Sequence, residues 1–393
     1  MNKNVHIIGA YNTKFGNLIE ETIYSLYEEA AKGAIKDAGI DIKEIDAVFV
    51  GNYSGGSFNN QEHIAPYGVN ILPELRFKPM YRAENACASG TSAIHLAEMA
   101  IKSGKAKKVL VVGVEKMNSL DTKNTSLALA KASYWEKEGA LGYTFPGLFA
   151  EYGKGWMSHY GYSLEQLQEY LAEIASKAYH FGSQNPLAHL QKSRSKEDIL
   201  NLPDEKNPMI AYPLRLHDCS LISDGAAAVI LSAEKKENSV EIMATSSASD
   251  YLNIVDSKRG NYFLDGAAEA TKNAFKQAKM TIDDIQLAEV HDCFTITELL
   301  IYSAIGLTKK GNEFEALLNK EVYLGGRCVI NASGGLKSKG HPVGATGVSM
   351  HALLYKQLTN NAIGVQVTNA NAALVLNIGG SGASNMVSIL KRS

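Results

Sequence analysis

The sequence predicts an α/β fold that is built from two related halves with an inserted loop domain, and two observations support this prediction. Short continuous apolar runs alternate along the chain with amphipathic helical segments, as in proteins whose parallel strands are buried on both faces. In addition, residues 274–288 repeat the order of helix, acidic turn and strand that residues 34–48 show in the first half.

The first half begins with a predicted strand at residues 5–10. An amphipathic helix follows over residues 20–38, because its apolar residues are spaced for one face, and Gly39 ends it as a C-cap. Further buried strands are expected at residues 45–50 and 107–114. This alternation is typical of a mostly parallel sheet that is covered by helices.

The middle of the chain, residues 118–213, differs in composition from its flanks. It is richer in Tyr, His, Lys and Gly, and a capping box at residues 163–166 predicts a helix through Lys177. A buried strand at residues 225–231 then resumes the first half. We therefore assign residues 1–117 and 214–236 to an N-terminal half and residues 118–213 to an inserted cap. Residues 237–393 form the C-terminal half.

The two halves share residues as well as the order of their elements. Five positions are identical when residues 34–48 are placed over residues 274–288. These pairs are Ala34/Ala274, Lys36/Lys276, Ala38/Ala278, Ile42/Ile282 and Ile45/Ile285. Five identities within the same order of elements indicate a duplicated α/β unit. Two such halves, packed face to face, would bring the N-termini of their helices to one shared surface.

The composition of this 393-residue chain excludes several classes of protein. A formal net charge of −2 provides no basic field for nucleic acid or for an anionic membrane surface. No apolar run is long enough for a signal peptide or a membrane span. The four cysteines lack CxxC spacing, which argues against a zinc site and predicts reduced thiols in a cytoplasmic protein. They are Cys87, Cys219, Cys293 and Cys328, of which Cys219 and Cys328 are interpreted as structural.

Cys87 is the first candidate functional residue. It stands just before a predicted helix whose first turn contains the small residues Ser89 and Gly90. Unpaired amides and the positive end of the helix dipole would stabilise a thiolate at this place and make the thiol reactive. A buried core cysteine explains the same stretch equally well, so the rest of the chain has to decide between the two interpretations.

Three clusters of candidate functional residues follow predicted strands in the second half. They are His291-Asp292-Cys293-Phe294 after residues 286–290, Gly340-His341-Pro342 beyond residues 328–330, and Gly379-Gly380 after residues 373–377. A nucleophilic thiol needs a base, which is usually a histidine, and His341 has little freedom between a glycine and a proline. Cys293 is a candidate for a second acid or base with a pKa near neutrality.

Carbonyl chemistry also requires donors for a developing oxyanion. The amide of Cys87 with the turn at Gly379 and Gly380 is one candidate pair, and His291 with His341 is another. Each feature also has a structural explanation, because loop histidines, tight glycine turns and helix-opening cysteines are common without function. No glycine-rich nucleotide-binding motif stands in a strand–loop–helix context.

Taken together, these stretches resemble the thiolase family along nearly the whole chain. The resemblance rests on four motifs, with secondary support from residues 213–228. The motifs are Asn85-Ala86-Cys87-Ala88-Ser89-Gly90, His291-Asp292-Cys293-Phe294, Gly340-His341-Pro342-Val343-Gly344-Ala345-Thr346-Gly347 and Asn377-Ile378-Gly379-Gly380. Each motif alone is modest, but four of them in this order on a duplicated α/β chain are highly specific.

The resemblance implies a five-layer α-β-α-β-α sandwich and a role for each candidate residue. Cys87 would be acylated by a CoA thioester, and His341 would activate it. His341 and His291 would form one oxyanion hole, and the backbone amides of Cys87 and Gly379 would form the other. Ser220 would contact the pantetheine arm of the substrate.

The chain departs from the commonest thiolase pattern at two places. It has His291-Asp292-Cys293-Phe294 where the commonest form has Asn-Glu-Ala-Phe, and it has Asn377 where that form has a cysteine. One cysteine is lost and another is gained, so two thiols remain, and we assign the second acid/base to Cys293. This arrangement resembles the sterol-carrier-protein-2-type and archaeal-type thiolases.

The resemblance thus implies a CoA-dependent thiolase of lipid metabolism. It would cleave a 3-oxoacyl-CoA, or run the reverse Claisen condensation, through an acyl-cysteine intermediate. It implies CoA as substrate and no metal or prosthetic group. It also implies a homodimer or homotetramer, and it allows a complex with a partner synthase. Two alternatives stay open: a decarboxylating ketoacyl synthase-like enzyme, and a non-catalytic acyl-CoA-binding subunit of a complex.

Overall fold

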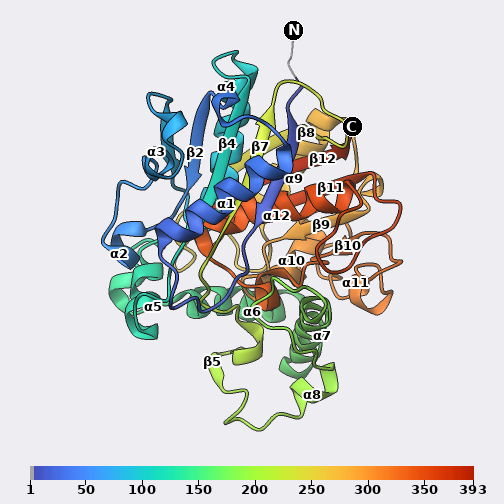
Figure 1. The fold of residues 1–393 in the computed structure, drawn as a ribbon. Coiled ribbons are helices and arrows are strands. Elements are labelled where there is room, and N and C mark those ends of the chain that lie inside the picture. The colour runs from blue at the N-terminus through green and yellow to red at the C-terminus, as the bar shows by residue number, and fades with distance from the viewer. Residues whose placement is uncertain (1–3) are drawn as a thin grey trace.

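The computed structural model describes residues 4–393, in which ten strands form one mixed sheet with helices around it (Figure 1). Residues 1–3, which the prediction includes in the N-terminal half, lie outside the described residues. The strands are β1 His6–Asn12, β2 Ala47–Gly51, β3 Met80–Ala83, β4 Lys108–Glu115, β7 Gly225–Ser232, β8 Val240–Ser249, β9 Leu287–Val290, β10 Val329–Ile330, β11 Ala372–Gly379 and β12 Ser384–Arg392. A separate ribbon joins β5 Met209–Ala211 to β6 Leu214–Arg215.

The large sheet consists of two halves with the same topology. From the outer edge inward, their strand orders are β3-β2-β4-β7-β1 and β10-β9-β11-β12-β8. In each half the second strand pairs in parallel with both neighbours, and the last strand of the half pairs antiparallel with both of its neighbours. The halves join where His6 pairs with Glu241 and Ile7 with Val240. The predicted α/β fold of two duplicated halves is thus confirmed.

Helices form layers outside and between the two half-sheets. They are α1 Ile23–Ala38, α2 Gly55–Asn59, α3 Tyr67–Ile71, α4 Ser89–Lys102, α5 Thr122–Ala130, α6 Phe145–Tyr160, α7 Leu164–Ser183, α8 Lys196–Leu200, α9 Asp265–Ala278, α10 Thr295–Ala304, α11 Glu315–Leu318 and α12 Val343–Leu358. α12 packs on strands of both halves, and side chains of α4 reach β11 and β12, so these two helices form the middle layer. α1 covers the N-terminal half-sheet and α9 the C-terminal one, which completes the predicted α-β-α-β-α sandwich.

The repeated segment folds alike in both halves. α1 ends at Gly39 (φ +58°), and α9 ends at the corresponding Lys279 (φ +54°), both in the left-handed conformation. A single 3₁₀ turn follows each helix, at Ile42–Glu44 and Ile282–Asp284, and leads into β2 and β9. Glycine adopts this conformation freely, whereas it costs a residue with a Cβ about 1–2 kcal/mol. The two helices therefore share the same backbone conformation at their ends although the residue there differs.

The core explains why β4 has no polar side chain between Val109 and Val114. Val109 and Val111 pack in the core that contains the middle layer, whereas Leu110 and Val112 pack against α1 on the other face. A strand that is buried on both faces loses the polar alternation of a half-exposed strand. This is the pattern from which the sequence predicted the strand.

Element ends differ from the predictions by small amounts. β1 runs to Asn12, because Tyr11 and Asn12 still pair with Ala228 and Ala227 of β7. α7 begins at its capping box as predicted but continues to Ser183, because its last turns remain packed in the apolar core. The pairing partners that set these ends are distant in sequence, so local patterns cannot locate them.

The middle of the chain contains α5, α6, α7, α8 and β5, which lie at one end of the sheets, away from the C-terminus (Figure 1). A buried ion pair between Lys177 of α7 and Glu298 of α10 (2.8 Å) attaches this region to the C-terminal half. Its description as an inserted cap with the stated boundaries stays a prediction. Within residues 4–393, no helix combines the length and the apolar character that crossing a membrane requires.

Candidate active site

Cys87 lies in a tight turn between β3 and α4. Ala86 has φ +48°, a left-handed conformation that costs a residue with a Cβ about 1–2 kcal/mol. The hydroxyl of Ser89 closes the turn, since it donates to the carbonyl of Ala86 (2.6 Å) and accepts from the amide of Asn85 (2.8 Å). α4 starts at Ser89, so Cys87 precedes the helix instead of lying in its first turn.

Burial makes Cys87 a protonated thiol. Loss of water raises the pKa of Cys87 to about 12, the charge of Glu115 acts in the same direction, and the amides of Gly380 and of Cys87 itself oppose the shift. The prediction that the helix N-terminus favours a thiolate is therefore wrong for the resting site, because desolvation outweighs the nearby dipoles. A base has to take the proton when Cys87 reacts.

His341 is placed to be that base. Gly340, with φ +115°, and Pro342 hold the backbone on either side of it. The hydroxyl of Thr346 donates to the carbonyl of Pro342 (3.0 Å), so it accepts from Nδ1–H of His341 (2.7 Å), and Nε2 keeps a free lone pair. Burial lowers the pKa of His341 well below its ordinary value, which keeps the imidazole neutral.

His291 follows β9 and presents a donor. Nδ2 of Asn377 lies 3.2 Å from Nδ1 of His291, and an amide nitrogen can only donate, so Nδ1 is the acceptor. The proton of the neutral ring is therefore on Nε2, which is buried and has no hydrogen-bond partner within residues 4–393. Burial lowers the pKa of His291 to about 3, so the ring stays neutral at physiological pH.

The structure brings three of the predicted residues together. Sγ of Cys87, one ring nitrogen of His291 and one of His341 all lie within 4.8 Å of one another. The two imidazole rings are 5.1 Å apart and nearly perpendicular, at 82°. These side chains come from the turn before α4, the end of β9 and the loop before α12, so both halves of the chain contribute to one centre.

Cys293 lines the same pocket at the start of α10. Its Sγ lies 3.8 Å from Oγ1 of Thr297, and its carbonyl accepts from the amide of Ser220 (2.9 Å). Burial raises the pKa of Cys293 well above its ordinary value, and the nearby Cys87 raises it further, so this thiol is also protonated. Ser220 lines the pocket as well. Its contact with pantetheine stays a prediction.

Two amides lower the pKa of Cys87: that of Cys87 itself and that of Gly380, the residue after the predicted Gly379. Gly380 has φ +63° and lines the pocket, whereas Gly379 is the last residue of β11. A Cβ on Gly379 would lie 2.3 Å from the carbonyl of Asn85, so this glycine lets β11 pass close to the Cys87 turn. The sequence cannot separate the two glycines, and the oxyanion role of Gly379 stays a prediction.

The pocket around these side chains has a volume of about 250 Å³ and a mostly apolar lining. Phe149 of α6 and Phe294 stack in its wall, with ring centroids 4.8 Å apart. Other apolar residues of the lining include Met117, Leu129, Phe145, Pro146, Ile222 and Val343. An apolar enclosure excludes water from a reacting carbonyl and strengthens each hydrogen bond made to it.

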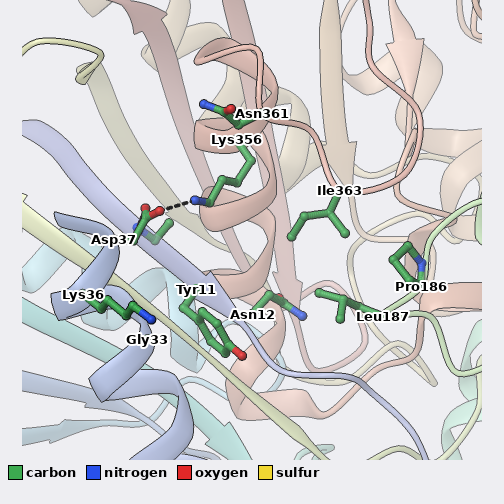
Figure 2. A pocket seen from close by; sticks show the side chains of 11 residues that line it. Tyr11, Asn12, Gly33, Lys36, Asp37, Pro186, Leu187, Lys356, Asn361 and Ile363 are labelled. Atoms are coloured by element: carbon green, nitrogen blue, oxygen red, sulfur yellow. Dashed lines mark hydrogen bonds and ion pairs between the residues drawn. The ribbon is translucent and has the colours of Figure 1, made fainter. Parts of the chain in front are cut away.

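A larger cavity, of about 720 Å³, lies against α1, β1 and the C-terminal end of α12 (Figure 2). Asp37 of its lining accepts from Lys356 and from the amide of Ala10, and Tyr11 donates to Glu29, which lies outside the lining. Figure 2 shows Asp37 and Lys356 pointing towards each other. Neither a cysteine nor a histidine is among the described residues that line this cavity, so it is not the candidate active site.

Three residues to which the sequence assigned no role support the site. Thr346 and Asn377 orient the two imidazole rings, and Glu115 accepts from the amide of Gly344 in the first turn of α12 (3.0 Å). Thr346 and Asn377 lie within the motifs that the sequence analysis identified. A polar side chain beside buried strand and helix residues is the feature that could have indicated their role. Glu115 has no comparable signal, because its partner lies far along the chain.

Two family models and several curated relatives match the chain. The model "Thiolase, N-terminal domain" matches residues 5–192, and the model "Thiolase C-terminal domain-like" matches residues 247–392. The acetyl-CoA acetyltransferase of Methanothermobacter thermautotrophicus is 39% identical over 99% of this chain and 100% of its own length. Human sterol carrier protein 2 is 32% identical over 97% of this chain and 71% of its own length.

A solved structure shows the same fold. The human mitochondrial 3-ketoacyl-CoA thiolase in complex with CoA aligns with a TM-score of 0.74 and 18% identity over 100% of this chain and 98% of that chain. The archaeal enzyme and sterol carrier protein 2 are relatives of the two kinds that the motif His291-Asp292-Cys293-Phe294 indicates. Since the family models match most of the chain and relatives above 30% identity span nearly all of it, the chain belongs to the thiolase family of acyltransferases.

Proposed function

We propose that the protein is a CoA-dependent thiolase that transfers the acyl group of a 3-oxoacyl-CoA to CoA through an acyl group on Cys87. One observation carries the proposal. A nucleophilic thiol, a neutral imidazole with a free lone pair, an imidazole N–H donor and a second buried thiol share one apolar pocket. The activity that the archaeal relative's name states is of this kind.

In the first half-reaction, Sγ of Cys87 attacks the C3 ketone while Nε2 of His341 takes the thiol proton. The bond between C2 and C3 then breaks, and its electron pair passes to C2, which gives the enolate of acetyl-CoA. His291 and the protonated His341 donate hydrogen bonds to the enolate oxygen. The thiol of Cys293 gives its proton to C2, so acetyl-CoA leaves and Cys293 becomes a thiolate.

In the second half-reaction, the thiolate of Cys293 takes the proton of the CoA thiol, and the CoA sulfur attacks the acyl carbon. The amide of Cys87, with that of Gly379 as predicted or of the adjacent Gly380, stabilises the oxyanion of this step. Sγ of Cys87 leaves and recovers its proton from His341. Every group returns to its starting protonation state, so the cycle balances with CoA as substrate and without a metal or prosthetic group. Condensation is the same sequence in reverse.

Acylation of Cys87 tests the proposal. Incubation with acetyl-CoA, followed by intact-mass measurement and peptide mapping, should show one acetyl group on Cys87. Acetoacetyl-CoA with CoA should give two molecules of acetyl-CoA per turnover. Absence of both adduct and turnover would support a non-catalytic acyl-CoA-binding subunit. Turnover that requires a malonyl thioester and releases carbon dioxide would support a decarboxylating synthase.

The size of the pocket indicates short acyl chains. Its volume is about 250 Å³, and the stacked rings of Phe149 and Phe294 limit its extension. We therefore expect kcat/KM to fall as the 3-oxoacyl chain lengthens from four carbons, in the same turnover assay. A kcat/KM that increases with chain length would contradict this inference.

We also propose that the protein forms a homo-oligomer through the outer edge of the N-terminal half-sheet. β3 is the edge strand, and apolar side chains are exposed on it and beside it. Phe77 is 88% exposed just before β3, and Met99 is 59% exposed on α4, which packs on β3. An exposed strand edge beside apolar side chains is the kind of surface that a second copy covers.

Met99→Glu should therefore shift the protein towards the monomer in sedimentation velocity experiments at micromolar concentration, because a charge would be buried in the interface. Leu318→Glu is the matched control, since Leu318 is 65% exposed on α11 of the other half. A wild-type protein that sediments as a monomer, or an equal effect of the two variants, would contradict the proposed interface.

We infer a cytoplasmic location from the chemistry of the site. The proposed cycle needs Cys87 and Cys293 as thiols, and both are free cysteines in the structure. Reducing compartments keep thiols in this form. Recovery of the protein in the cytosolic fraction of its native cells would support the location, and recovery in an oxidising compartment would oppose it.

A further inference from the structure

Asn377 is fully buried at the junction of three segments of the site. Its Oδ1 accepts from the hydroxyl of Thr91 on α4 (2.9 Å). Its Nδ2 donates to the carbonyl of Cys87 (3.1 Å) and lies 3.2 Å from Nδ1 of His291. These partners set the orientation of the amide, because a rotated amide would place its oxygen against the carbonyl oxygen of Cys87.

This orientation decides which nitrogen of His291 carries the proton. Nδ1 accepts from Asn377, so the proton of the neutral ring lies on Nε2. Nε2 is buried, and it has no hydrogen-bond partner in the described part of the chain. Neither nitrogen of His291 therefore offers a lone pair to an incoming group, and the ring can only donate.

The same centre has the donor set of a metal site. Cys87, His291 and His341 place one potential ligand atom each within 4.8 Å of the other two. A thiolate with two imidazoles and one open position suits Zn²⁺ and Co²⁺. His341 already has a free Nε2, and Thr346 holds its other nitrogen as the outer partner of a metal-bound histidine would. A metal ion displaces the proton of a thiol ligand when it binds, so the proton on Nε2 of His291 is the remaining obstacle to a complete set.

We propose that Asn377 is a positioning residue that holds His291 in its Nε2–H form and thereby keeps soft divalent metal ions out of the centre formed by Cys87, His291 and His341. The use of this N–H as a donor to substrate rests on the proposed function, whereas the exclusion of metal does not. A metal ion bound here would hold Cys87 as a ligated thiolate and block its attack on a substrate.

The substitution Asn377→Asp tests the proposal, because it keeps the shape of the side chain and replaces the donor by an acceptor. Nδ1 of His291 would then carry the proton, and Nε2 would open towards the centre, in a carboxylate–histidine–metal arrangement. We expect the variant to bind one Co²⁺ or Zn²⁺ about 10- to 100-fold more tightly than the wild type, as measured by competition with a chelator.

Two controls accompany this variant. Adding Cys87→Ser to Asn377→Asp should remove the thiolate-to-Co²⁺ charge-transfer absorption and most of the gain in affinity. Asn385→Asp places the same buried carboxylate on the neighbouring strand β12, and it should bring no gain, since Asn385 bonds to the carbonyls of Ala248 and Gly382 instead of a ring. Equal metal affinity of Asn377→Asp and the wild type would overturn the proposal.

A spectrum of the wild type decides the question if Asn377→Asp does not fold. In protein labelled with ¹⁵N-histidine, His291 should show a protonated Nε2 and an unprotonated Nδ1 at neutral pH, with His291→Gln as the assignment variant. A protonated Nδ1 would overturn the proposal. Neither readout uses turnover, so a wild type that fails to acylate Cys87 would count against the proposed function and leave the tautomer result to stand by itself.

Discussion

Alanine in place of Cys293 is expected to lower the rate of acetoacetyl-CoA thiolysis about 10³-fold, the middle of the range for loss of a general acid or base. The proton that C2 receives would have to come from water, which the apolar pocket excludes. Acetylation of Cys87 by acetyl-CoA breaks no carbon–carbon bond and moves no proton at C2. In that half-reaction Cys293 acts only on the departing CoA sulfur, and a thiolate leaves readily without a proton because thiols are acidic. That half-reaction should therefore stay within about tenfold of the wild-type rate.

Stopped-flow thiolysis and quenched-flow acetylation, run on the same preparations, would separate the two effects. Cys328→Ala is the matched control, because it removes an equally buried thiol that does not line the pocket. We expect near-normal rates from it in both assays. Unchanged thiolysis in Cys293→Ala would refute the assignment of Cys293 as the second acid/base, and an equal loss in both half-reactions would assign it to packing around Cys87.

The substitution His341→Asn is expected to slow both half-reactions about 10³-fold at neutral pH. Burial raises the pKa of Cys87 to about 12, so at pH 8 only about one thiol in 10⁴ would ionise without a base. In the wild type the neutral imidazole accepts this proton during attack, which removes the need for a free thiolate. His341 therefore supplies most of the reactivity of Cys87.

The pH dependence provides the test of this role. Without His341, the thiolate must form by direct ionisation, and its fraction increases tenfold for each pH unit below a pKa of about 12. The acetylation rate of His341→Asn should therefore increase about tenfold per pH unit from pH 7 to pH 10. The wild-type rate should be nearly flat over this range, since burial lowers the pKa of His341 well below its ordinary value and the imidazole is already neutral.

Thr346→Val provides a graded control for the same residue. It keeps the imidazole but removes the hydroxyl that accepts from Nδ1, so only a part of the ring population would expose its lone pair to Cys87. We expect an intermediate loss, with the flat pH profile of the wild type. A pH profile of His341→Asn that stays flat would contradict the role of His341 as the base.

Much of the fold follows from local patterns in the chain. Continuous apolar runs, apolar spacing of period 3.6, the glycine after α1 and the capping box of α7 mark the elements, and the five identities between the halves mark the duplication. Their ends are less well determined. β1 extends to Asn12 because its partner on β7 is still present there, and that partner lies more than two hundred residues away in sequence.

In the candidate site, too, the sequence identified the residues and the structure determined their state. Motifs pointed to Cys87, His291, Cys293 and His341, because thiols and imidazoles beside strand ends are chemically conspicuous. The structure differs from the sequence-based prediction in the protonation state of Cys87 and in the amides that act on it. Cys87 is a buried thiol with a raised pKa instead of a dipole-stabilised thiolate, and the amides that oppose this rise are those of Gly380 and of Cys87 itself.

By itself, the sequence determined the class of its most regular elements, the two-fold repeat and the inventory of reactive groups, since each of these depends on local patterns of residues. Tertiary structure alone decided their protonation. Burial sets the pKa of the two thiols, and hydrogen bonds from Thr346 and from Asn377 set the tautomers of the two histidines. Desolvation and long-range hydrogen bonding arise only when distant segments pack together, and no local pattern records them.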